Sequence, residues 1–152
     1  MKRLVLSGAS ALVLFPVLAA AYEPRPARPA AFEKHAEFDC NWRAKGASIG
    51  RGEQSPVLSI VDPKFESWSD NEDHAIELSA GGGSDRVEAL SYVIHSAEKG
   101  STLAIFLDAA ARSVVGGARQ LQIWKGGKPV LDLAFANTPS AEDLAACVSE
   151  GD

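Results

Sequence analysis

The sequence predicts a mainly β (α+β) domain, with an antiparallel sheet in a sandwich or half-barrel and two short helices in the C-terminal half. Two observations support this. Short segments in which apolar and polar residues alternate recur along the chain, separated by Gly, Pro, Asn and Asp. Helix-capping residues precede short apolar-rich segments at only two places in the last third.

The first half of the domain is expected to contain three strands. Within Glu37–Arg43 three apolar residues alternate, which indicates a strand with one buried face: Phe38, Cys40 and Trp42. Residues 46–54 are polar and contain glycine, so they are interpreted as a loop. Val57–Val61 and His74–Ser79 are the next two strands.

Residues 86–96 fit two structures. Asp85 and Glu88 would form a capping box for a helix. A strand is favoured because β-prone residues cluster here and large ones alternate, at Leu90, Tyr92 and Ile94. Residues 97–100 would then be the turn into a partner strand at Ser101–Leu107.

The last third contains both predicted helices and a hairpin. Asp108 can cap a helix over Ala109–Val115, which Gly116 and Gly117 would end. Gln120–Trp124 and Val130–Phe135 are predicted strands. Ser140 can cap the final helix, whose buried face would carry Leu144, Cys147 and Val148.

The connection within that hairpin determines which side chains face each other. A two-residue turn at Gly126-Gly127 would place Leu121 opposite Asp132. A three-residue loop that starts at Lys125 would instead place Leu121 opposite Leu131, and Gly127 in the left-handed region. We predict the three-residue loop, because it puts leucines on one apolar face.

The N-terminus is typical of an export signal. Lys2 and Arg3 precede an apolar run, and small alanines at positions 19 and 21 predict cleavage near Ala21. The expected organisation is a signal peptide at 1–21, a Pro-rich leader at 22–31 and one domain at 32–150. The run is too short for a stable membrane span, so we expect a periplasmic or secreted protein without stable membrane insertion.

Charge and cysteine content agree with this organisation. Loss of Lys2 and Arg3 with the signal changes the formal net charge from −5 to −7, which disfavours nucleic-acid binding. In an oxidising compartment the two cysteines, Cys40 and Cys147, are expected to form one structural disulfide. They lack the Cys-x-x-Cys spacing of a redox-active pair.

The segment from Leu107 to Cys147 combines an alanine-rich helix ending in two glycines, the triplet Leu121-Gln-Ile, the strand Gly127-Lys-Pro-Val-Leu-Asp-Leu and a helix with Ala141 and Leu144. This order resembles the end of the invasion-associated locus B family of small secreted alphaproteobacterial proteins. The resemblance implies a β-rich protein of the bacterial envelope with no known cofactor. It transfers no catalytic residue.

Three groups of residues are candidates for chemistry or binding. The acidic loop before the third strand gathers oxygen and nitrogen donors that suit Ca²⁺ or Zn²⁺: Asp70, Glu72, Asp73 and His74. The loop lacks the spacing of an EF-hand, and a solvated acidic loop is the alternative. The tip of the C-terminal hairpin is a candidate contact patch, with Trp124, Lys125 and Lys128.

The third group is a candidate nucleophile. Ser84 follows Gly81-Gly82-Gly83, and His74 or His95 would have to serve as its base. The sequence has no Gly-x-Ser-x-Gly elbow, and the glycines are equally typical of a turn.

The leading hypothesis is therefore a non-catalytic exported protein that binds an envelope or extracellular protein and uses no cofactor. Two alternatives remain open: a small-ligand or metal-binding protein that uses the 70–74 loop, and a small hydrolase.

Overall fold

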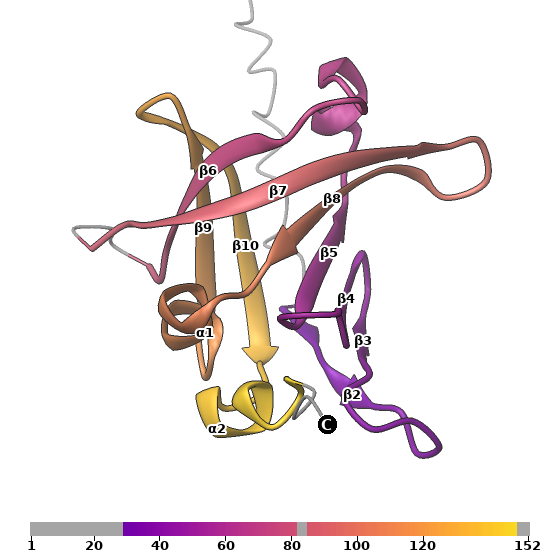
Figure 1. The fold of residues 1–152 in the computed structure, drawn as a ribbon, viewed down its shortest axis with the longest axis vertical. Coiled ribbons are helices and arrows are strands. Elements are labelled where there is room, and N and C mark those ends of the chain that lie inside the picture. The colour runs from indigo at the N-terminus through magenta and orange to yellow at the C-terminus, as the bar shows by residue number, and fades with distance from the viewer. Residues whose placement is uncertain (1–28, 82–84, 149–152) are drawn as a thin grey trace, which may run out of the picture.

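A computed structural model describes residues 29–81 and 85–148. The predicted signal peptide, its cleavage site and Ser84 lie outside these residues. The described chain forms one mixed sheet in the strand order β1-β10-β9-β6-β7-β8-β5-β4-β3-β2 (Figure 1). The predicted fold class is confirmed, because strands dominate and the two α-helices are short and lie in the C-terminal half.

The first six strands and a 3₁₀ helix occupy the N-terminal half. They are β1 (Ala30–Ala31), β2 (Glu33–Lys34), β3 (Trp42–Ala44), β4 (Ala47–Gly50), β5 (Val57–Val61), the 3₁₀ helix Pro63–Ser67 and β6 (His74–Ser79). The C-terminal half contains β7 (Val87–Ser96), β8 (Gly100–Phe106), α1 (Ala109–Val115), β9 (Gln120–Lys125), β10 (Lys128–Asn137) and α2 (Ala141–Ala145).

The sheet curls until it is nearly a closed barrel. Its two outermost strands, β1 and β2, are separated in the chain by Phe32 alone, and β1 also lies beside β3. Asn137 at the end of β10 holds this seam with a pair of hydrogen bonds. The Phe32 N–H donates to its Oδ1 at 2.8 Å, and its Nδ2 donates to the Phe32 carbonyl at 3.3 Å. The amide side chain therefore pairs with Phe32 much as a strand backbone would.

The interior of the curled sheet is a packed apolar core. Inward-facing residues of the central strands are fully buried, among them Ile49, Leu58, Leu78, Leu103 and Ile105. Both α-helices lie at one end of the sheet (Figure 1) and contact each other. They close that end with buried Val115 and Leu144. None of the helices in the described residues is long and apolar enough to cross a membrane.

Short-range signals predicted several elements correctly. The strand favoured for residues 86–96 is confirmed as β7, Val87–Ser96, and it forms the predicted hairpin with β8. The helix Ala109–Val115 has the predicted bounds, and the Asp108 carboxylate accepts the Ala111 N–H at 2.9 Å. The Ser140 hydroxyl accepts the Asp143 N–H at 3.1 Å at the start of α2.

Two predictions in the first half are wrong. The expected strand at 37–43 reduces to Trp42–Ala44, because Cys40 adopts a φ of 60°, which a β-strand cannot contain. Phe38 is accordingly 58% exposed. The expected loop at 46–54 contains β4, because Gly46, with a φ of 76°, closes a two-residue turn between β3 and β4.

The predicted three-residue hairpin loop is also wrong. Lys125 pairs with Lys128, so the turn has two residues, and both glycines have the positive φ of a type I′ turn. Val130 is an extra residue in β10 and shifts the register there. Leu121 therefore faces Leu133 rather than Leu131 or Asp132. The extra residue that brings the leucines onto one face is therefore Val130 in the strand, rather than a third residue in the turn.

Candidate functional site

His74 of the acidic loop points into the protein and already has two partners. It is 4% exposed, and its Nε2 lies 2.6 Å from the Ser69 carbonyl oxygen. A carbonyl only accepts, so Nε2 carries the proton and donates, and Nδ1 is left to accept from Lys125 Nζ at 2.9 Å. Both ring nitrogens are therefore engaged, and a metal ion could bind only after one of these contacts breaks.

The acidic members of the candidate metal site do not converge on this imidazole. Asp70, Glu72 and Asp73 are all exposed. Within residues 29–81 and 85–148, no group of three or more His, Cys, Asp or Glu side chains is placed to hold a metal ion. The loop therefore has the geometry of a solvated acidic surface.

The candidate contact patch at the hairpin tip is tied into the body of the protein. Lys125 Nζ lies 4.0 Å from the centroid of the Trp68 ring in addition to its contact with His74. The indole N–H of Trp124 donates to Ser79 Oγ at 3.0 Å. Lys128 is exposed. The pairing of β6 with β9 thus joins two groups that the sequence kept apart, the 70–74 loop and the hairpin tip.

A serine–histidine contact occurs at His95. Its Nδ1 lies 2.8 Å from Ser101 Oγ, and its Nε2 lies 2.8 Å from the Trp68 carbonyl oxygen. Ser101 is 6% exposed, and neither residue lines the surface hollows described below. The serine hydroxyl is therefore buried and lies outside these hollows, which does not favour a role as a nucleophile.

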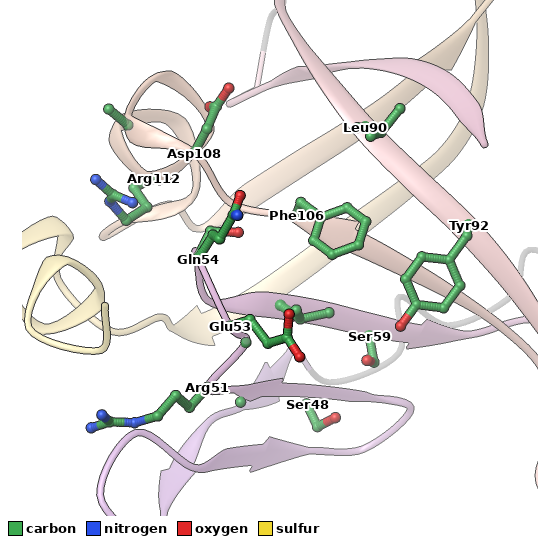
Figure 2. Close-up of a pocket in the computed structure, with 15 residues that line it drawn as sticks. Ser48, Arg51, Glu53, Gln54, Ser59, Leu90, Tyr92, Phe106, Asp108 and Arg112 are labelled. Carbon is green, nitrogen blue, oxygen red and sulfur yellow. The ribbon is translucent and has the colours of Figure 1, made fainter. Parts of the chain in front are cut away.

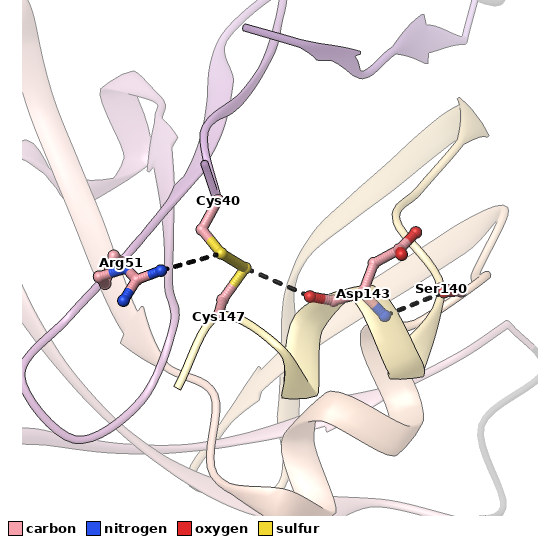
Figure 3. Close-up of a disulfide and its surroundings, with 5 residues drawn as sticks. All are labelled: Cys40, Arg51, Ser140, Asp143 and Cys147. Atoms are coloured by element: carbon pink, nitrogen blue, oxygen red, sulfur yellow. Dashed lines mark hydrogen bonds between the residues drawn. A yellow bond between two sulfur atoms is a disulfide. The ribbon is translucent and has the colours of Figure 1, made fainter. Parts of the chain in front are cut away.

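The predicted disulfide is confirmed and lies at the barrel seam. Cys40, in the turn between β2 and β3, is bonded to Cys147, just after α2, across 107 residues of chain (Figure 3). The Arg51 Nη2 donates to Cys40 Sγ at 3.8 Å, a weak contact from the loop that follows β4. The bond ties the N-terminal edge of the sheet to the C-terminal helix.

The most unusual surface of the protein is the outside of its three central strands. Outward side chains of β5, β8 and β7 lie in three rows, and we call these nine residues the outer apolar face: Val57, Phe106 and Leu90; Ser59, Ala104 and Tyr92; Val61, Thr102 and Ile94. Leu90 precedes the part of β7 that pairs with β8, and it lines the same surface hollow as Val57 and Phe106. Seven of the nine are apolar or aromatic. An antiparallel sheet that meets water on its outside normally carries polar residues there.

Several large side chains of this face are exposed, although Ala104 at its centre is buried. Leu90 is 49%, Ile94 47% and Val61 41% exposed, and they are three of the four exposed large hydrophobic residues among the described residues. Outward positions of β9 and β10 include polar or small residues such as Gln122, Asp132 and Ala134, and the large outward side chain there, Trp124, is partly buried. Contiguous exposed apolar area of this kind marks interaction sites.

Five residues of the outer apolar face form the floor of a groove of about 1040 Å³: Val57, Ser59, Leu90, Tyr92 and Phe106. Figure 2 shows Tyr92 and Phe106 side by side on this floor, and their ring centroids are 5.4 Å apart. The loop with Glu53 and Gln54 borders the floor at one side, and the start of α1 borders it at another (Figure 2). The groove therefore combines an aromatic floor with polar borders, as ligand sites do.

A second hollow, of about 590 Å³, continues the first and shares Ser48 and Ser59 with it. Its apolar lining includes Val61 and Ile94, and its charged lining is purely basic, from Arg43 and Lys99. The charged residues of the first groove are mixed in sign, two arginines and two carboxylates: Arg51, Arg112, Glu53 and Asp108. The two hollows together thus have a basic excess within a chain of net charge −5.

The sequence contained a signal for this face that was not interpreted as a site. Leu90, Tyr92 and Ile94 alternate, and alternation alone indicates a buried face. In the structure the smaller set, with Ala89 and Ser91, faces the core and the larger set faces outward. A strand with apolar residues in both phases within an otherwise amphipathic sheet is the signal that would have found it.

Comparison with known proteins assigns neither a family nor a function to the chain. No protein-family model matches the chain, and neither the curated proteins nor the solved structures provide a significant match.

Proposed function

We propose that this protein is an exported, non-catalytic interaction module that binds a partner protein with its outer apolar face. The observation that supports the proposal most strongly is the exposure of Leu90 in the aromatic groove and of Ile94 and Val61 in the hollow that continues it. Burial of three such side chains would contribute roughly 2–4 kcal/mol at about half of their full transfer value. An exposed apolar surface of this kind favours aggregation unless a partner covers it.

Export is part of the proposal. A disulfide persists in oxidising compartments, which suits the periplasm or the exterior of a cell. The signal-like N-terminus and the resemblance of Leu107–Cys147 to the invasion-associated locus B family support an envelope protein as well. The partner is accordingly an envelope or extracellular protein.

Site-specific photo-cross-linking in the producing cell tests the proposal. A photoreactive phenylalanine analogue replaces Leu90 in the groove, and a matched sample carries it at Ala134, an exposed outward position on β10. We expect an adduct of defined mass from position 90 alone, and we expect Ile94→Asp to abolish it. Equal adducts from both positions, or none from position 90, would refute binding at this face.

A further inference from the structure

We infer that the partner presents an extended segment with alternating apolar residues and acidic residues beside them, which lies across the outer apolar face. This inference rests on the proposed function and names the chemistry of its partner. It is carried by the juxtaposition of the aromatic floor at Tyr92 and Phe106 with the basic hollow at Arg43 and Lys99.

The size of the face favours a segment over a folded protein surface. Three strands spaced about 4.8 Å apart, with outward residues about 6.8 Å apart along each, make a patch of roughly 15 by 20 Å, or about 300 Å². A stable dimer buries about 800 Å² on each partner, so the apolar patch is too small to hold a second copy by itself. An extended segment of six residues is about 20 Å long and matches the patch.

The outward rows provide complementary positions for such a segment. The first row has Phe106 and Leu90, the second has Tyr92, and the third has Val61 and Ile94. Apolar side chains of an extended peptide that point the same way are also about 6.8 Å apart, so successive ones can reach successive rows. The hydroxyls of Ser59 in the second row and Thr102 in the third can form hydrogen bonds with the peptide backbone.

The charged residues of the second hollow determine which charge the bound segment should carry. Arg43 and Lys99 are exposed, and they line the hollow that also contains Val61 and Ile94. The hollow has no acidic lining residue to neutralise them. A basic segment would be repelled there, whereas carboxylates would find two cations beside the apolar contacts. The acidic end of the segment therefore lies over β5 and the outer part of the β7–β8 hairpin.

Three synthetic octapeptides test this chemistry on the mature protein. All alternate leucine with a second residue, which is glutamate, glutamine or lysine, and all have blocked ends. Binding is followed by amide chemical shifts of the ¹⁵N-labelled chain. We expect the glutamate peptide to shift amides of β5, β7 and β8 and to bind several-fold more tightly than the glutamine peptide, with the advantage lost at high salt.

Matched double variants locate the charge effect. Arg43→Gln with Lys99→Gln should weaken the glutamate peptide about fivefold to tenfold and leave the glutamine peptide unchanged. Arg119→Gln with Lys128→Gln removes the same charge from exposed positions outside both hollows, and should change neither affinity by more than about twofold.

Other results would overturn the inference in recognisable ways. Tighter binding of the lysine peptide, or equal weakening by both double variants, would contradict an acidic partner and leave binding at the face intact. Shifts of the same amides on concentration of the protein alone would identify a second copy as the occupant. No shift with any peptide would refute a segment as the partner, while the cross-linking result at position 90 would still decide the proposed function.

Discussion

Removal of the disulfide is the perturbation whose magnitude follows most directly from the structure. The bond closes a loop of 107 residues. With the chain-entropy relation, a loop of that length confines the unfolded chain by about 4.8 kcal/mol at 25 °C. The double variant Cys40→Ala with Cys147→Ala should therefore lose about 5 kcal/mol of unfolding free energy. Ala avoids placing a hydroxyl at position 147, which is fully buried.

The variant should nevertheless fold if its total stability is ordinary, since small domains have about 5–15 kcal/mol. The seam keeps other ties, namely the two hydrogen bonds between Phe32 and Asn137 and the packing of Phe32 on Phe135, whose ring centroids are 5.0 Å apart. Amide exchange should accelerate in β2 and β3 at the seam and change least in β7 and β8, which lie in the middle of the sheet.

Urea unfolding of the oxidised wild type, the reduced wild type and the double variant measures the effect. The slope of unfolding free energy against urea should rise in both forms without the bond, because the unfolded chain expands. A loss below about 2 kcal/mol with an unchanged slope would refute the reasoning, since it would mean that the bond does not restrict the unfolded chain.

Three further substitutions test local features of the fold. Gly116→Ala should destabilise by about 1–3 kcal/mol, because the added Cβ would lie 2.5 Å from backbone of α2, while Gly50→Ala meets nothing within 4 Å; equal urea midpoints would contradict this. Lys125→Met should lower the unfolding free energy by about 1–2 kcal/mol, because the buried His74 imidazole loses its donor. Lys128→Met, at the other side of the same turn, should change the unfolding free energy little, and a larger loss at position 128 than at 125 would contradict the stabilising contact of Lys125 with His74 and Trp68. Deletion of Val130 should remove the bulge and keep the pairing of β9 with β10, with a loss of about 1 kcal/mol of unfolding free energy. Backbone NMR contacts between β9 and β10 that shift by one residue would instead show that the bulge is required for this register.

The parts of the fold that the sequence predicted correctly depend on near neighbours. Asp108 and Ser140 cap helices whose N–H groups lie three residues away, so the signal is contained in a few positions. The disulfide could be predicted from compartment and cysteine number alone. The prediction of a strand at 37–43 is wrong because the alternation of apolar residues does not reveal that Cys40 has a left-handed backbone conformation.

The site depended on partners far away in the chain. His74 and Lys125 meet only because β6 pairs with β9, and the sequence does not state which strands become neighbours. In β7 both alternating sets contain apolar residues, so the choice of which set faces inward depends on the space left by β6 and β8. That choice places Leu90 and Ile94 on the surface and creates the groove.

The closure of the sheet has a consequence for how the protein can associate. An open sheet ends in strands whose unpaired N–H and C=O groups can template further strands, which is a route to fibres. Here the two outermost strands, β1 and β2, have two residues each and adjoin one another through Phe32, and very short edge strands oppose such growth. Association through the outer apolar face would thus use side chains, whereas the outermost strands provide only a short backbone ladder to which another strand could add.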